Sequence, residues 1–177
     1  MKKYEFTGET KEIKLLFRTA VLHRIRATVS FGFVKIGDLG GWIEKEENLS
    51  HEGKAWVCGD AKVWGNAEVW GNAKVWGNAK VCGDAKVCGD AKVFSASHVL
   101  VIGAIGSRND FTTFYRDKDN EITVKCGCFL GKIDRFLEKV TQTHGDSKYA
   151  LVYRAAVEVA KLQIDLLGEA PKDADEE

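Results

Sequence analysis

Small apolar residues recur with a period of six along the middle of the chain. From Ala55 to Ala96 the sequence is seven consecutive hexads, AWVCGD, AKVWGN, AEVWGN, AKVWGN, AKVCGD, AKVCGD and AKVFSA. The Ala and Val of a hexad are two positions apart, so on a strand both point to one side and their neighbours point to the other. This period fits neither an α-helix nor a coiled coil. It predicts a parallel β-helix in which three hexads form one coil, with Gly followed by Asn or Asp at the corners.

A coil of eighteen residues determines which outward side chains are neighbours, because paired strands lie about 4.8 Å apart. We expect Cys58, Trp76 and Phe94 in one column, Trp64 beside Cys82 in the second, and Trp70 beside Cys88 in the third. The register can be extended backwards to residue 37, which makes ten hexads. It then places Gly41 and Gly53 in the glycine column and Leu39 and His51 on the inward side.

The flanking segments have other patterns. Alternating apolar residues predict strands near 13–17, 21–27 and 29–33, which would cap the open end of the coils. Downstream, strands are expected at 99–102, 111–115 and 121–126. A helix with Phe129, Ile133, Phe136, Leu137 and Val140 on its apolar face should follow, then a second helix with a stripe of Val152, Ala155, Val159, Leu162 and Leu166.

These elements predict a mainly β protein with a C-terminal α+β domain of order β-β-β-α-α. We divide the chain into an N-terminal strand cap (1–36), a hexapeptide-repeat β-helix (37–97), the α+β domain (98–168) and an acidic mobile tail (169–177).

Composition narrows the functional classes only modestly. The chain has 26 basic and 26 acidic residues, so its mean charge does not favour nucleic acid or an anionic membrane. We find no apolar run long enough for a membrane span and no signal-peptide core, and we expect a cytoplasmic protein. The five cysteines include no CxxC pair, so neither a disulfide framework nor a zinc ribbon is expected.

Two resemblances add to this picture. Val57 with Ala61, and each later Val with the Ala four residues on, follow the pattern of the left-handed hexapeptide-repeat β-helix proteins, and the resemblance implies a left-handed coil. Four stretches resemble uncharacterised bacteriophage and prophage proteins that end in a domain of unknown function: LHRIRA (22–27), residues 37–55 beginning with GDLGGWIE, GSRNDFTTFYR (106–116) and CGCF (126–129). This second resemblance implies a phage accessory role in the host cytoplasm, including the countering of host defence.

Two sets of residues are candidate sites. Polar groups gather in one C-terminal stretch and would be the first place to look for a small anionic, nucleotide-like ligand: Ser107, Arg108, Asn109, Thr113, Tyr115 and Arg116. The alternative is a glycine turn with a surface arginine. The outward aromatic residues are candidates for an interface, or are covered by lysine stems and flanking segments: Trp56, Trp64, Trp70, Trp76 and Phe94.

Catalytic readings have weaker support. Hexapeptide β-helices often transfer acyl groups from acyl-CoA with a histidine as base, but the repeats contain no histidine after His51. Cys126 or Cys128 with His144 could form a thiol and imidazole pair, and buried structural thiols are the alternative. We therefore expect a non-enzymatic, homo-oligomeric binding protein without cofactor or metal, whose target is a host protein or a small anionic ligand. A hexapeptide acyltransferase is the alternative.

Overall fold

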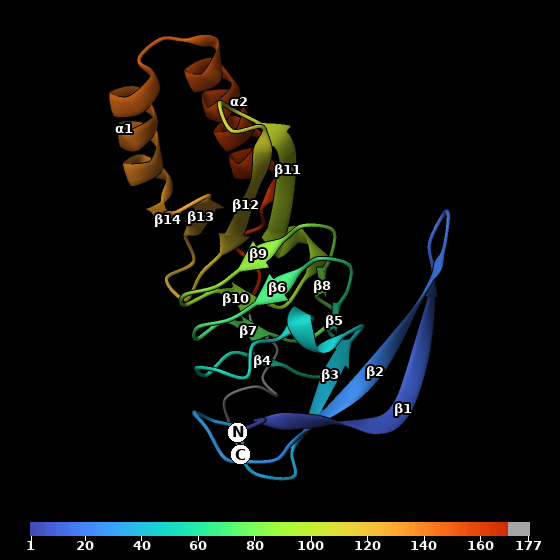
Figure 1. Ribbon diagram of the computed structural model, residues 1–177. Coiled ribbons are helices and arrows are strands. Elements are labelled where there is room, and N and C mark those ends of the chain that lie inside the picture. The colour runs from blue at the N-terminus through green and yellow to red at the C-terminus, as the bar shows by residue number, and fades with distance from the viewer. Residues whose placement is uncertain (170–177) are drawn as a thin grey trace.

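The computed structural model describes residues 1–169. The coils form the middle of the molecule, with an antiparallel sheet beside their first turn and a second sheet with two helices beyond their last turn (Figure 1). The fold class is as predicted: N-terminal antiparallel strands, short parallel repeats, then an α+β region. Of the expected acidic tail, residues 170–177 lie outside the described residues.

The hexads form the predicted parallel coils. Each contributes a two-residue strand: β4 (Trp56–Val57), β5 (Lys62–Val63), β6 (Glu68–Val69), β7 (Lys74–Val75), β8 (Lys80–Val81), β9 (Lys86–Val87) and β10 (Lys92–Val93). Val57 pairs with Val75 and Val75 with Val93, which confirms the spacing of eighteen. Every inward Ala and Val of these strands is at most 1% exposed. The corner glycines have φ between 61° and 73°, a conformation that side-chain-bearing residues rarely adopt. The left hand of the coil stays a prediction from the resemblance.

The first coil departs from the predicted register. Ile43, at the end of β3 (Leu39–Ile43), pairs with Val63, and Leu49 pairs with Val69, so this part of the coil is two residues longer. The two extra residues lie between Leu49 and Gly53, because Gly53 already lies against Gly71 at the regular spacing of eighteen, whereas the 3₁₀ turn η1 (Glu46–Asn48) fills an ordinary six-residue interval between Ile43 and Leu49. Ile43 and Leu49 therefore take the inward places, and the predictions for Leu39, which is exposed, and for His51 were wrong.

The N-terminal strands form a long hairpin on one side of the first coil. Strands β1 (Tyr4–Lys14) and β2 (Thr19–Ala27) are antiparallel, and β2 continues through β3 into the ladder of β5 and β8. The predicted strand at 29–33 was wrong, because Gly32 has a φ of 55° and turns the chain so that Phe31 pairs with Val34. Lys3 Nζ donates to Ala55 O at 2.7 Å and Tyr4 Oη to Leu49 O at 2.8 Å, so this segment satisfies carbonyl groups of the first coil.

The C-terminal region has one strand more than expected. A 3₁₀ turn, η2 (Ala96–His98), leads into an antiparallel sheet of β11 (Val99–Ile105), β12 (Asp110–Arg116), β13 (Ile122–Cys126) and β14 (Phe129–Lys132). Helices α1 (Ile133–His144) and α2 (Lys148–Gln163) follow. Phe129 was expected on the helix and lies on β14, paired with Cys126, because Gly127 and Cys128 form a tight turn that returns the chain to the sheet.

Helix α2 buries the face opposite to the one predicted. Its buried residues are Ala150, Tyr153, Ala156, Val157 and Ala160. The predicted stripe of Val152, Ala155, Val159 and Leu162 is exposed, and of that stripe only Leu166, just after the helix, packs against the core. Both faces are apolar, so periodicity alone did not discriminate between them. The alanine-rich face lies inward because small side chains let the helix approach the sheet closely.

Candidate functional site

Strand β12 joins the last coil to the C-terminal core. On its coil-facing side, Thr113 Oγ1 accepts a hydrogen bond from Lys86 N at 3.0 Å, and Tyr115 Oη donates to Cys88 O at 2.9 Å. On its other side, Phe114 belongs to the core beneath the helices. Burial raises the pKa of Tyr115. Both hydroxyl groups are therefore used to connect the two parts of the molecule.

Arg116 extends this junction. Its guanidinium donates to Asn120 Oδ1 at 2.6 Å and to Gly168 O at 2.7 Å, and it lies over the Phe94 ring at 4.8 Å. Beside it, His98 Nδ1 accepts from Phe94 N at 3.3 Å. Burial, and then the charge of Arg116, lower the pKa of His98 to about 4. The arginine is buried and structurally engaged, so it offers little to an external anion.

The other three members of the predicted anion site lie at the opposite end of the strand. Ser107, Arg108 and Asn109 form the exposed turn between β11 and β12. At a rise of about 3.3 Å per residue, Asn109 and Thr113 are roughly 13 Å apart. The structure thus divides the predicted set into an exposed turn and a buried junction, and does not bring it together as one pocket.

An acidic loop next to the junction is neutralised by a lysine. One carboxylate oxygen each of Asp117, Asp119 and Glu121 lies within 4.8 Å of the others. Lys132 Nζ forms ion pairs with Asp117 and, at 2.6 Å, with Glu121. The ammonium group provides the positive charge that a metal ion would supply there, so this cluster does not point to a metal site.

Most of the outward aromatic residues are covered by other parts of the chain. Trp56 is buried under Tyr4 and Phe31, and Trp76 is buried against Phe94 with ring centroids 4.9 Å apart. Trp64 is half-buried in a small apolar cluster with the hairpin. Trp70 is half-buried on an open side of the coils. Trp70 also lines a groove.

The histidine and cysteine candidates are in structural surroundings. The His51 ring stacks on Tyr4 with centroids 4.2 Å apart, and its Nδ1 accepts from Lys3 N at 3.2 Å. Cys128 is exposed in the turn between β13 and β14. Cys126 Sγ accepts from Thr112 Oγ1 at 3.3 Å, whereas His144 lies at the far end of α1, where its ring packs on Tyr149 and Tyr153.

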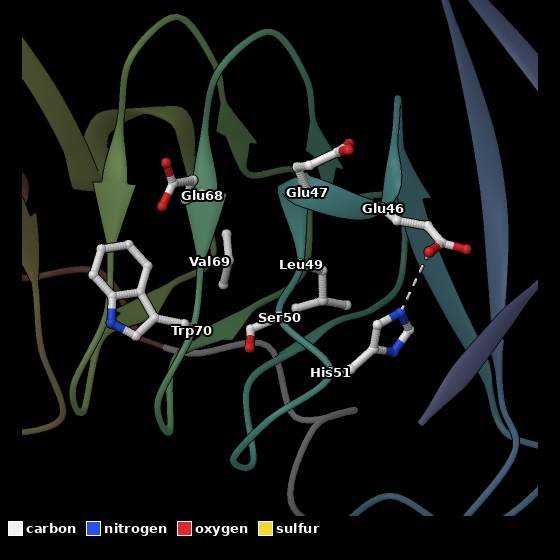
Figure 2. A pocket seen from close by; sticks show the side chains of 8 residues that line it. All are labelled: Glu46, Glu47, Leu49, Ser50, His51, Glu68, Val69 and Trp70. Atoms are coloured by element: carbon white, nitrogen blue, oxygen red, sulfur yellow. Dashed lines mark ion pairs between the residues drawn. The ribbon is translucent and has the colours of Figure 1, made fainter. Parts of the chain in front are cut away.

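A groove that the sequence did not reveal lies between η1 and β6. It has a volume of about 520 Å³ and is lined by Glu46, Glu47, Leu49, Ser50, His51, Glu68, Val69 and Trp70. Figure 2 shows Glu47 on η1 and Glu68 on β6, with their carboxylates pointing away from each other, and Trp70 on the side of Glu68. The run EKEEN (44–48) was the available signal, but nothing in the sequence showed that Glu68 and Trp70 lie beside it.

Two further surfaces expose apolar side chains. One is the outward face of α2, defined as Leu151, Val152, Ala155, Val159 and Leu162, with Leu162 90% exposed. The other is the hairpin tip, residues 15–18, where Leu16 is 88% and Phe17 93% exposed. Among residues 1–169, no helix is both long and apolar enough to cross a membrane.

No family model matches the chain, and no curated protein matches it.

Proposed function

We propose that the protein is a non-enzymatic binding protein, in which the coils are the rigid scaffold of a homo-oligomer and the C-terminal region recognises a protein partner. The observation that carries this proposal is the outward face of α2. The opposite face of this helix already packs on the sheet through Tyr153 and Val157. The outward leucines and valines are therefore not needed to hold the helix in place.

The outward face has the spacing of a helix-pairing seam. Val152, Ala155, Val159 and Leu162 follow one another at intervals of three, four and three, which aligns them along one side of a helix. Exposed apolar side chains gathered in one patch are typical of protein contacts. A partner that offers an amphipathic helix would cover this seam.

The positions of the residues predicted to bind a small anion favour a protein partner instead. Thr113, Tyr115 and Arg116 are engaged at the junction, and the exposed turn leaves Arg108 as the one basic residue among Ser107, Arg108 and Asn109. No observation favours acyl transfer, because His51 is stacked and hydrogen-bonded in the N-terminal cap. The resemblance to phage proteins supports a partner in the host cytoplasm, with a component of host defence as one such target.

Site-specific photo-crosslinking in bacterial cells tests the proposal. A benzoylphenylalanine at position 162, in the outward face, is compared with the same residue at exposed Lys139 on α1. We expect a discrete adduct with another protein from position 162 only, and its loss when Val159→Glu is added to a chain whose circular dichroism is unchanged. No adduct at 162, equal adducts at both positions, or an adduct with a second copy alone would overturn the recognition role.

A further inference from the structure

The hairpin tip is held firmly while its most apolar residues face away from the chain. Leu15 packs against the cluster of Ala20, Leu22 and Trp42, and Leu15 N donates to Arg18 O at 2.8 Å to close the turn. Arg18 forms an ion pair with Glu44, which in turn accepts from Gly65 N at 2.7 Å. Leu15 and Arg18 thus fix the two ends of the tip, and Leu16 and Phe17 point outward between them, 88% and 93% exposed.

The groove between η1 and β6 offers an apolar side chain and negative charge. The side chains of Leu49 and Val69 point into the coil beneath it, so its accessible apolar group is the half-buried indole of Trp70, and Glu47 and Glu68 lie at its sides. Glu46 is paired with Lys2, but within the described part of the chain neither Glu47 nor Glu68 has an ion-pair partner. The groove therefore suits a segment that is apolar at its centre and basic at its edge.

The hairpin tip is a segment of that kind. It carries Leu16 and Phe17, with the exposed Lys14 immediately before it in KLLFR (14–18). A chain does not fill its own groove with this tip. The tip is fixed beside the sheet that contains β3, β5 and β8, whereas the groove lies at β6, which belongs to a different sheet of the coil.

We propose that the hairpin tip of one copy docks in the groove of a second copy, with Phe17 against Trp70 and Lys14 facing Glu47 and Glu68. The proposal rests on the homo-oligomeric scaffold proposed above and names its interface. Tip and groove are different surfaces, so the contact is heterologous, and each copy in it keeps one unused tip or one unused groove. Such a contact builds either a closed ring or an open chain.

Sedimentation velocity of the full chain tests this contact with two variants. Phe17→Ser removes the aromatic side chain of the tip. Glu47→Lys with Glu68→Lys reverses the charge of the groove. Each should weaken assembly about 30-fold or more, the usual effect of losing a central contact. Leu167→Ser, at an equally exposed leucine that belongs to neither surface, is the matched control and should assemble normally. Leu16→Ser is a second tip variant, and circular dichroism verifies the fold of each protein.

Mixing the variants gives the sharpest result. The Phe17→Ser protein keeps its groove and the charge-reversed protein keeps its tip, so two proteins that are each monomeric should form a one-to-one dimer that does not grow further. A wild-type chain that is monomeric overturns both the scaffold and this contact. If the wild type assembles and neither variant weakens that assembly, the scaffold stands and the proposed contact is wrong. A mixture of the two variants that stays monomeric would also overturn the contact.

Discussion

Removing one complete coil should be less damaging than removing one residue. Deletion of residues 61–78 joins Asp60 to Ala79 and lets Lys80 and Val81 replace Lys62 and Val63 beside β3, because these positions already stack at a spacing of eighteen. The contacts of β9 and β10 with β12 lie downstream and stay intact. The corner sequence Gly-Asp-Ala-Lys is also kept.

The cost of the coil deletion follows from its size. Natural domains have a net stability of about 0.05 to 0.15 kcal/mol per residue, so eighteen residues correspond to about 1 to 3 kcal/mol. The deletion also replaces Trp64, which packs against the cluster of Ala20, Leu22 and Trp42, by Cys82, which removes apolar contact worth about 1 kcal/mol more. We expect a free energy of unfolding lower by about 2 to 4 kcal/mol.

Deletion of Lys62 alone makes Ala61 and Val63 adjacent, so both cannot point inward. Losing the burial of one valine costs about 2 to 4 kcal/mol. Two ladder hydrogen bonds, Lys62 N to Ala79 O and Trp64 N to Val81 O, would be broken as well, at about 1 kcal/mol each. The total of about 4 to 6 kcal/mol exceeds the cost of the whole coil.

Urea unfolding followed by far-UV circular dichroism measures both variants. The expected order of midpoints is wild type, then the coil deletion, then the Lys62 deletion. A Lys62 deletion that unfolds at the same urea concentration as the coil deletion, or at a higher one, would refute the reasoning.

Three further changes probe other parts of the molecule. Val81→Asp should lower the free energy of unfolding by several kcal/mol because it places an unpaired carboxylate in the coil interior, whereas exposed Lys80→Asp should change it little; equal urea midpoints would contradict the inward assignment. The pKa of His98 is depressed in the folded state, so the unfolded chain takes up a proton that the folded chain resists, and stability should fall by up to about 3 kcal/mol as pH drops from about 6.5 to about 4. His98→Asn should flatten that dependence in urea titrations at several pH values; an unchanged slope would contradict it. Gly40→Ala would place a Cβ 2.4 Å from Cγ1 of Ile25 and should cost about 1 to 3 kcal/mol, visible as a lower melting temperature, and an unchanged melting temperature would contradict that packing.

The coils were predictable because seven hexads repeat the same pattern of inward Ala and Val. The inward positions hold only Ala and Val, so a single register satisfies every repeat, and the spacing of eighteen followed from three hexads per coil. The first coil was not predictable in the same way. Its two extra residues lie between Leu49, which pairs with Val69, and Gly53, which lies against Gly71, and no repeat in the sequence marks this change of spacing.

The surfaces depend on neighbours that a sequence pattern does not specify. Helix α2 has two apolar faces, and periodicity does not say which one meets a sheet. Thr113, Tyr115 and Arg116 had the composition of a ligand site, but the coil end beside β12 occupies their polar groups. The groove combines η1 with Trp70, which requires the stacking of coils to be known first.

Disulfide trapping across the coils tests the central claim, that each residue lies beside the residue eighteen positions later. Asn66 Nδ2 and Asp84 Oδ1 are 3.1 Å apart at stacked corners, a placement that suits a disulfide. In a chain whose natural cysteines are replaced by Ala or Ser, Asn66→Cys with Asp84→Cys should form an intramolecular bond on mild oxidation, whereas Asn72→Cys with Asp84→Cys, twelve positions apart, should not. Equal yields of the two linked peptides by mass spectrometry, or linkage of the second pair alone, would contradict the coil.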